Sequence, residues 1–391
     1  MSYLLTSTIA LLTSASVSLA PLGTEKNSAE ENKFHHIRSE FPSLTLSEGN
    51  SILFGKLCYA KLVKKNYKSA LRDCTKSIEI NPNSYYTIYL RGVVKSKLND
   101  LQGAIDDIKR SIDLNSDYAY SYSELGDAKV KLNDLEGAIV AYTKAIEVDP
   151  EYEYAYQERG EIYMKLMQYK AAVDDYSKII EIDPKSKFAY AVRGDAKYAL
   201  EDTQGALIDY NKAINLDPEY AYVYASIGDL KVKLNDLKGA ITAYSKAIAI
   251  DAEYEYAYQE RGEIYMKLKQ HEAAVNDYSQ MIEIDPKSEF AYSMRAKAKF
   301  ILKDYKGASS DYTMAININP ANENNYKRRA GVSYLIEDYD AALDDINKAI
   351  AISPSNGILY YARGDIKSKL GDNDGAISDY SKAAELGVDN D

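Results

Sequence analysis

Two short segments with a helical spacing of apolar residues recur in every stretch of 34 residues. Between 153 and 186 the apolar positions form a first and a second group: Tyr156, Tyr163 and Leu166, then Ala172, Val173, Tyr176 and Ile180. Spacings of three, four and seven residues place side chains on one face of an α-helix. The pattern therefore predicts two amphipathic helices in each stretch.

Turn and stop signals separate these predicted helices and end them. Sequences such as Leu-Asn-Asp-Leu lie between the two segments, where Asp134 or Asp236 can cap the second helix by accepting from its free backbone N–H groups. Pairs such as Asp183-Pro184 follow the second segment, and the residue before a proline disfavours helical geometry. The expected element is a helix–turn–helix hairpin, and the expected fold class is all-α.

Proline and alanine positions fix the period at 34 residues. Apart from Pro21 and Pro42, neighbouring prolines are separated by 34 or 68 residues: Pro82, Pro150, Pro184, Pro218, Pro286, Pro320 and Pro354. Counted from Ser51 as place 1, place 20 is always alanine: Ala70, Ala104, Ala138, Ala172, Ala206, Ala240, Ala274, Ala308, Ala342 and Ala376. The chain thus divides into ten contiguous repeats: 51–84, 85–118, 119–152, 153–186, 187–220, 221–254, 255–288, 289–322, 323–356 and 357–390.

Small and aromatic side chains follow the same period. Place 8 is always small, being Gly in seven repeats and Ala296, Ala330 or Cys58 in the others. Place 4 is Tyr from Tyr122 to Tyr360, and place 24 is mostly Tyr. Two helix backbones should approach closely at place 8, with the large rings filling the space beside it.

A 34-residue helical hairpin with aromatic, small, alanine, aromatic and proline residues at these places resembles the tetratricopeptide repeat (TPR) family. The resemblance covers about 340 of the 391 residues, with departures such as Ser116 and Ala252 in place of the proline. It implies a right-handed superhelical solenoid of antiparallel helix hairpins in which each repeat is stabilised by its neighbours. No polar helix follows the tenth repeat, so the terminal helix is expected to expose Ala383 and Leu386.

The sequence also has a longer period of 102 residues, equal to three repeats. The repeats starting at Ala119 and Glu153 closely resemble those starting at Ala221 and Glu255, sharing the run Glu-Tyr-Ala-Tyr-Gln-Glu-Arg-Gly-Glu-Ile-Tyr-Met-Lys. This indicates duplication of a block of three hairpins. Two similar surfaces on one chain would suit a repeated or bivalent partner.

The resemblance also implies a concave groove lined by places 2, 5, 9 and 12 of the first helices. Across the central repeats these places are aromatic, acidic or apolar. The candidate groove residues are Tyr120, Asp127, Tyr154, Glu161, Met164, Phe188, Asp195, Tyr198, Tyr222, Asp229, Tyr256, Glu263, Met266 and Phe290. Such a surface suits a peptide segment carrying Lys or Arg beside apolar residues.

Two other interpretations of these residues stay open. The tyrosines at place 2 can be half-buried packing residues, and the acids can form a solvated face. Family members that act as co-chaperones grip acidic C-terminal tails with Lys, Asn and Arg, whereas place 9 here offers Asp or Glu in five successive repeats. Acidic chaperone tails are therefore unexpected partners.

Net charge and the few histidines argue against nucleic acid and against catalysis. The formal net charge is −11, which repels phosphate backbones. His35 and His36 precede the repeats and His271 opens a second helix, so none has a partner at the spacing that metal or nucleophilic chemistry requires. We expect no enzyme activity, no cofactor and no metal site.

Cys58 and Cys74 both fall in the first repeat at places that should face the core. They can be small buried hydrophobic residues, or they can form a disulfide that joins the two helices. Only an oxidising compartment would allow that disulfide to persist.

The N-terminal segment 1–20 has a weakly apolar stretch that ends in small residues, as in a secretory signal peptide, but it lacks basic residues. Export is one reading; a retained membrane anchor and a cytoplasmic protein with a disordered start are the others. Residues 21–50 are rich in charge and Ser, which predicts a disordered linker or a short cap.

The sequence as a whole predicts a non-catalytic scaffold or adaptor for protein–protein interaction, with a groove that binds a basic and apolar peptide. The alternative is a self-assembling structural solenoid or assembly factor that acts through its terminal surfaces, forming a homo-oligomer through the C-terminal helix. Both rest on the repeat, because a repeat array specifies shape better than purpose.

Overall fold

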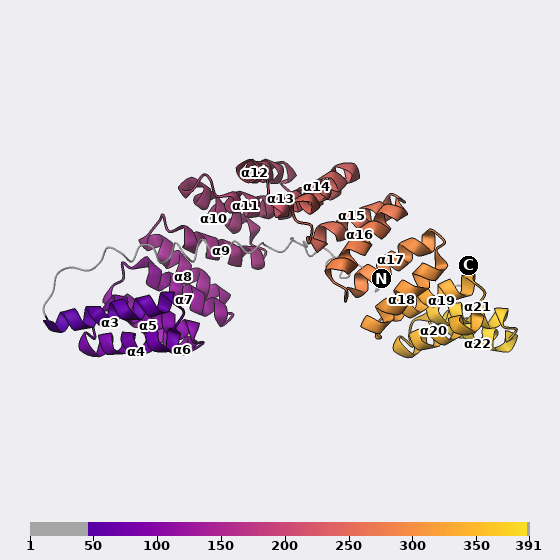
Figure 1. The fold of residues 1–391 in the computed structure, drawn as a ribbon, viewed down its shortest axis with the longest axis horizontal. Helices are drawn as coiled ribbons and strands as arrows, with labels where there is room; N and C mark the ends of the chain where they lie inside the picture. The colour runs from indigo at the N-terminus through magenta and orange to yellow at the C-terminus, as the bar shows by residue number, and fades with distance from the viewer. Residues whose placement is uncertain (1–45, 389–391) are drawn as a thin grey trace. The chain divides into compact units, whose positions relative to one another are not determined.

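Figure 1 shows the computed structural model, which describes residues 46–388. The signal-type segment 1–20 and residues 21–45 of the predicted linker lie outside this range. Helix α3 begins at Leu46, so the linker's last residues belong to the first described helix. The chain forms two compact units, one ending at Pro218 and one starting at Glu219, and each is described by itself.

The described part of the first unit contains five helix hairpins. Its helices are α3 (Leu46–Val63), α4 (Tyr67–Ile80), α5 (Tyr85–Lys97), α6 (Leu101–Leu114), α7 (Ala119–Lys131), α8 (Leu135–Val148), α9 (Glu153–Lys165), α10 (Tyr169–Ile182), α11 (Lys187–Ala199) and α12 (Thr203–Leu216). Each helix packs on the next along the chain, so that every hairpin rests on its neighbour.

The second unit repeats this arrangement. Its helices are α13 (Ala221–Lys233), α14 (Leu237–Ile250), α15 (Glu255–Lys267), α16 (His271–Ile284), α17 (Glu289–Ile301), α18 (Tyr305–Ile318), α19 (Glu323–Leu335), α20 (Tyr339–Ile352), α21 (Gly357–Lys369) and α22 (Asn373–Glu385). Residues 46–388 contain no strand. The predicted all-α solenoid of helix hairpins is confirmed.

The turn inside each hairpin depends on one residue with left-handed backbone geometry. Place 15 has a φ between 56° and 83° in all ten repeats, for example 66° at Asn99 and 58° at Met167. Asn and Gly tolerate this geometry, whereas other residues are strained by it. The next residue then caps the second helix, and the caps expected at Asp134 and Asp236 are confirmed by bonds from the N–H groups of Gly137 and Gly239.

In six of the ten hairpins the core is a tyrosine laid across a glycine. The ring of Tyr142 crosses α7 at Gly126, where an added Cβ would lie 2.6 Å from the ring. Place 24 carries a tyrosine that is at most 2% exposed in six successive repeats: Tyr142, Tyr176, Tyr210, Tyr244, Tyr278 and Tyr312. Place 8 is small because a Cβ there would displace the ring from the helix.

The C-terminal end differs from the expectation that Ala383 and Leu386 are exposed. Ala383 is fully buried, as is place 27 in every repeat, and Leu386 is half-buried. Leu386 and Val388 lie against Gly357 at the start of α21. The exposed large apolar side chain on α22 is instead Ile377, at 63%.

Candidate functional site

The predicted groove residues all lie on first helices of the hairpins, from α7 to α17. Most of the aromatic and sulfur side chains are half-buried: Tyr120, Tyr154, Met164, Phe188, Tyr198, Tyr256, Met266 and Phe290. Tyr222 is more deeply buried, at 5% exposure. Half-burial leaves part of each ring at the surface, as both the groove and the packing interpretation require.

Two of the predicted acids each hold a pair of tyrosines. Asp127 accepts hydrogen bonds from the hydroxyls of Tyr142 at 2.7 Å and Tyr154 at 2.9 Å. The same arrangement recurs 102 residues later, where Asp229 accepts from Tyr244 and from Tyr256. Each aspartate thus links the core of its own hairpin to the first helix of the next.

Asp195 also has an internal partner. Its side chain accepts from the hydroxyl of Tyr210 at 2.9 Å, and the residue is 1% exposed. A buried carboxylate with a charge-assisted hydrogen bond stabilises the fold and offers little surface to a ligand. The sequence suggested one acidic stripe, but the structure divides it, because Asp127, Asp195 and Asp229 accept bonds from tyrosines of the hairpins.

Glu161 and Glu263 behave differently from these aspartates. Their side chains accept from the amides of Gln157 and Gln259 on the same helices, each at 3.3 Å. Glu263 is exposed and Glu161 is half-buried. These two glutamates, one in each compact unit, are therefore the predicted acids that remain on the surface of the first helices.

Burial changes the acidity of the carboxyl groups in the second unit. Burial raises the pKa of Asp229 to about 6, against the opposing effect of its two tyrosine bonds. It raises the pKa of the neighbouring Glu260 to about 7, and the charges of Glu263 and Asp229 add to the shift. Glu260 was not among the predicted residues, although it lies one turn before Glu263 on α15.

Tyrosine rings from successive repeats touch one another in the first unit. The ring centroids of Tyr118 and Tyr120 are 5.3 Å apart, those of Tyr120 and Tyr152 are 4.8 Å apart, and those of Tyr152 and Tyr154 are 5.9 Å apart. Such spacings are typical of stabilising aromatic pairs. A row of tyrosine rings therefore accompanies the predicted groove residues from the start of α7 to α9.

An ion-pair ladder on the other side of the first helices was missed in the sequence. Arg at place 7 binds Asp at place 23 of the same hairpin through two hydrogen bonds, as Arg159 does with Asp175 at 2.9 and 2.6 Å. Seven hairpins have this pair: Arg91–Asp107, Arg159–Asp175, Arg193–Asp209, Arg261–Asp277, Arg295–Asp311, Arg329–Asp345 and Arg363–Asp379. The sequence signal was available, because both charges recur at the period of 34.

The third and sixth repeats replace both members of this pair. They carry Leu125 with Ala141 and Ile227 with Ala243 at the same two places. An Arg without its Asp would leave a buried charge unpaired, which is strongly destabilising. The two places therefore change together in these repeats, whereas the first repeat has Leu57 at place 7 and its Asp73 pairs with Lys61.

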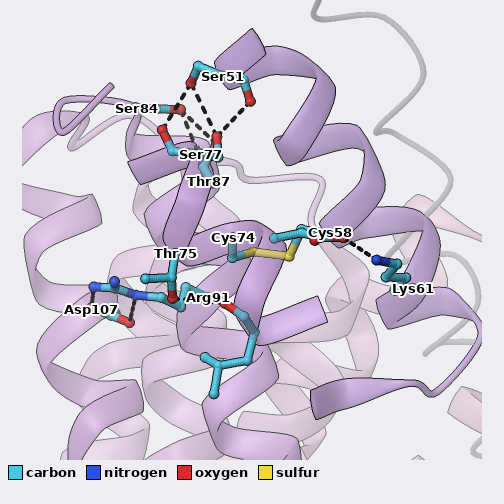
Figure 2. Close-up of a disulfide and its surroundings, with 12 residues drawn as sticks. Ser51, Cys58, Lys61, Cys74, Thr75, Ser77, Ser84, Thr87, Arg91 and Asp107 are labelled. Carbon is cyan, nitrogen blue, oxygen red and sulfur yellow. Dashed lines mark hydrogen bonds and ion pairs between the residues drawn. A yellow bond between two sulfur atoms is a disulfide. The ribbon is translucent and has the colours of Figure 1, made fainter. Parts of the chain in front are cut away.

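Cys58 and Cys74 form a disulfide between α3 and α4, shown in Figure 2. They occupy places 8 and 24, where other hairpins pack a glycine against a tyrosine, and both are fully buried. Close by, the hydroxyl of Ser77 donates to the backbone carbonyl of Ser51 at 2.7 Å. The first repeat is thus joined covalently at the point where the others rely on packing.

Residues 46–388 contain no candidate metal site and no helix that could span a membrane. No group of His, Cys, Asp or Glu in this range could hold a metal ion. None of the described helices is long and apolar enough to cross a membrane. His271 is the first residue of α16, and His35 and His36 lie outside the described range.

Comparisons with protein families and known structures agree with this geometry. Models described as "TPR repeat" and "Tetratricopeptide repeat" match 126–167, 153–186, 189–220, 228–269, 255–288 and 358–386. No curated protein matches the chain.

Several solved structures are similar in fold. The C-terminal part of a TPR repeat-containing protein from Cytophaga hutchinsonii is 19% identical, with a TM-score of 0.54 over 61% of this chain and 98% of its own. A tetratricopeptide repeat protein from Parabacteroides merdae is 17% identical, with a TM-score of 0.48 over 60% and 93%. YrrB, described as a TPR protein with an unusual peptide-binding site, is 23% identical, with a TM-score of 0.39 over 47% and 95%.

The hairpins, their packing and the family matches lead to the same conclusion. TPR arrays are in general scaffolds for protein–protein interaction, and this general role applies here. The chain belongs to the tetratricopeptide repeat family.

Proposed function

We propose that the first helices of the central repeats bind a peptide segment that carries Lys or Arg beside apolar residues. The observation that carries this proposal is the combination of half-buried aromatic and methionine side chains with Glu161 and Glu263 on the same helices. Half-buried rings supply contact area at low entropic cost, and a carboxylate at a protein surface forms charge-assisted bonds with a cation.

The hydrogen bonds that the aspartates accept from tyrosines limit which acidic residues can bind the peptide. Asp127, Asp195 and Asp229 hold tyrosine hydroxyls, so they position the aromatic surface and do not serve as ligands for a peptide. The carboxylates that pair with Lys or Arg of the peptide are those of Glu161 and its counterpart Glu263. One such glutamate in each compact unit suits a partner with two similar segments.

The test compares two variants with the same change in net charge. The first carries Glu161→Lys and Glu263→Lys. The control carries Glu136→Lys and Glu272→Lys, which lie exposed on the second helices α8 and α16. Both are screened against a display library of random twelve-residue peptides, after circular dichroism has shown equal helicity, and dissociation constants are then measured by fluorescence anisotropy.

We expect the wild type and the control to select peptides rich in Lys or Arg next to apolar residues. The Glu161→Lys and Glu263→Lys variant should bind these peptides at least about tenfold more weakly, equivalent to about 1.4 kcal/mol. Selection of acidic peptides, or equal binding by both variants, would show that the first helices do not form the peptide site.

Self-association through the C-terminal helix has less support than this proposal. Ala383, one of the two side chains on which that hypothesis rested, is buried inside its own hairpin. We therefore place the interaction surface on the first helices and not at the end of the array. The N-terminal segment remains proposed as a signal for export or membrane association.

A further inference from the structure

A group of mutually repelling carboxylates lies on the first helices of repeats six and seven. Glu260 is half-buried and Glu263 is exposed, one turn apart on α15. The charges of Glu263 and Asp229 both reach Glu260 and, together with burial, raise the pKa of its carboxyl group to about 7. Carboxyl groups that repel one another where solvent is partly excluded are a common feature of binding sites for cations.

A buried hydroxyl group with no hydrogen-bond partner in the described residues lies beside these carboxylates. Tyr278 is fully buried, and its hydroxyl has no hydrogen-bond partner among the residues that the structure describes. The hydroxyl lies against Gly262, which immediately precedes Glu263. Burial raises the pKa of Tyr278, and the charges of Glu263, Asp277 and Glu260 raise it further, as their proximity requires.

Other repeats show what this hydroxyl normally does. In four of them the tyrosine at place 24 donates to an aspartate at place 9: Tyr142 to Asp127, Tyr210 to Asp195, Tyr244 to Asp229 and Tyr380 to Asp365. Repeat seven has a glutamate at place 9, and its carboxylate accepts from Gln259 instead. A buried hydroxyl without a partner is destabilising, because it has lost its hydrogen bond to water.

The same costly arrangement occurs in repeat four, in the first compact unit. Tyr176 is fully buried and its hydroxyl also lacks a hydrogen-bond partner in the described part of the chain, while Glu161 accepts from Gln157. The charges of Glu161 and Glu158 reach this tyrosine as those of Glu263 and Glu260 reach Tyr278. Two copies of one unsatisfied site suggest that a ligand completes it.

We propose that Glu260, Glu263 and Tyr278 form a seat for a single protonated amine or guanidinium, with Glu158, Glu161 and Tyr176 forming a second one. This inference rests on the proposed peptide-binding function, because the cation is a Lys or Arg side chain of the bound segment. The carboxylates pair with the cation, and the tyrosine oxygen offers a lone pair to one of its N–H groups.

The seat should bind its cation more weakly at acidic pH. A cation favours ionised Glu260 and lowers the pKa of that carboxyl group, so affinity is full above pH 7 and is lost as protons occupy Glu260 below pH 7. The other groups facing the seat are Asp229 of α13, Tyr244 of α14, Tyr256 of α15, Asp277 of α16 and Lys297 of α17. Of these, Lys297 lowers the pKa of Glu263 and opposes the rise caused by burial.

The experiment uses the full chain and two matched probes. The charged probe is a fluorescent peptide that alternates Leu and Lys over eight residues, and the neutral probe is the same peptide with acetylated lysines. Anisotropy is measured at pH 8 and pH 5.5 for three proteins. They are the wild type, the variant with Glu158→Gln and Glu260→Gln, and a control with Glu136→Gln and Glu272→Gln at exposed sites on α8 and α16.

We expect the wild type and the control to bind the charged probe about tenfold more tightly than the neutral one at pH 8, with little difference at pH 5.5. The variant lacking Glu158 and Glu260 should show neither the preference nor its pH dependence. If this variant still binds the charged probe more tightly than the neutral one, the proposed seat is wrong. Wild-type binding that is equal for both probes, or absent for both, also overturns it, and the peptide-display screen then decides separately whether the groove itself stands.

Discussion

The length of the acidic side chain at place 9 determines whether the hydroxyl of the tyrosine at place 24 has a hydrogen-bond acceptor. Aspartate at place 9 accepts the hydroxyl of the buried tyrosine at place 24, as Asp195 does from Tyr210 at 2.9 Å. Glutamate at the same place reaches an amide on its own helix and leaves the hydroxyl without an acceptor in the described residues. One methylene group thus separates a structural acid from an acid at the surface.

Backbone geometry places a second restriction on single residues. The turn of every hairpin holds place 15 in the left-handed region, yet only Asn99, Asn133, Asn235 and Gly371 suit it well. The left-handed conformation costs other residues about 1–2 kcal/mol. Met167 shows this most clearly, because its side chain is 71% exposed and gains little from packing.

Replacing Met167 by Gly should therefore stabilise the chain by about 0.5–1 kcal/mol, because the strain at a φ of 58° is removed. The matched control is Met164→Gly, three residues earlier inside α9, which should destabilise by about 1 kcal/mol or more. Urea unfolding followed by circular dichroism measures both changes. A loss of stability in Met167→Gly would mean that the exposed side chain contributes more than the backbone strain removes.

The two helices of a hairpin are joined by either of two contacts. One is the Arg–Asp pair, whose aspartates are 2–7% exposed and whose arginines are 14–20% exposed. The other is the apolar contact of repeats three and six. Arg159 also donates to Thr143 of the preceding hairpin at 2.8 Å, so the charged contact links neighbours as well as partners.

The pair Arg159 and Asp175 tests whether these contacts are interchangeable. Asp175→Ala alone should destabilise the chain by about 3–5 kcal/mol, because it leaves the guanidinium partly buried and unpaired. The double variant Arg159→Leu with Asp175→Ala copies Leu125 and Ala141 and should recover most of that loss.

Thermal and urea unfolding of the single and double variants measure the difference. Tyr163 occupies place 11 of this hairpin, where other repeats have a lysine that also binds the aspartate, so no second cation complicates the result. A double variant as unstable as the single one would show that the ladder stabilises the array in ways the apolar pair does not reproduce.

Periodicity made the hairpins predictable from the sequence. Alanine at place 20, a small residue at place 8 and the aspartate caps each have a local physical reason, and that reason recurs at the same spacing. The all-α solenoid and the TPR family could therefore be inferred before any coordinates. The expectation that Ala383 is exposed was wrong, although place 27, which it occupies, is buried in every repeat.

The site was only partly predictable, for a physical reason. Spacing indicates which face of a helix carries Asp127 or Asp229, but it does not show which hydroxyl reaches the carboxylate from another helix. Whether the acid is structural or available to a ligand depends on that contact. Glu260 was overlooked for the same reason, since its raised pKa arises from burial and from the charges of Glu263 and Asp229, which depend on the packing of the helices.

Among the described residues, the first and last hairpins each pack on one neighbouring hairpin, and a repeat with fewer neighbours is stabilised less. The disulfide Cys58–Cys74 lies in the first of these hairpins and closes a loop with a sequence separation of 16. A cross-link over about 15 residues stabilises by about 3 kcal/mol in the chain-entropy model.

Reduction of the disulfide should therefore unfold α3 and α4 locally and leave the second compact unit unchanged. Hydrogen exchange followed by mass spectrometry, with and without a thiol reductant, measures the two regions in one experiment. A Cys58→Gly and Cys74→Tyr variant, which copies repeat three, is the control for loss of packing. Equal protection of α3 and α4 before and after reduction would contradict the expected role of the cross-link.

The Arg–Asp pair also bears on how the length of such a chain can change. Both charges belong to one hairpin, and the outward N–H of the arginine needs only an acceptor such as Ser177, Thr313 or Asn347 on the hairpin before it. Whole hairpins can therefore be duplicated or deleted without leaving a buried charge unpaired at the junction. The similar runs 102 residues apart are consistent with such a duplication. Because each Arg–Asp pair lies within one hairpin, the number of repeats can change by whole hairpins.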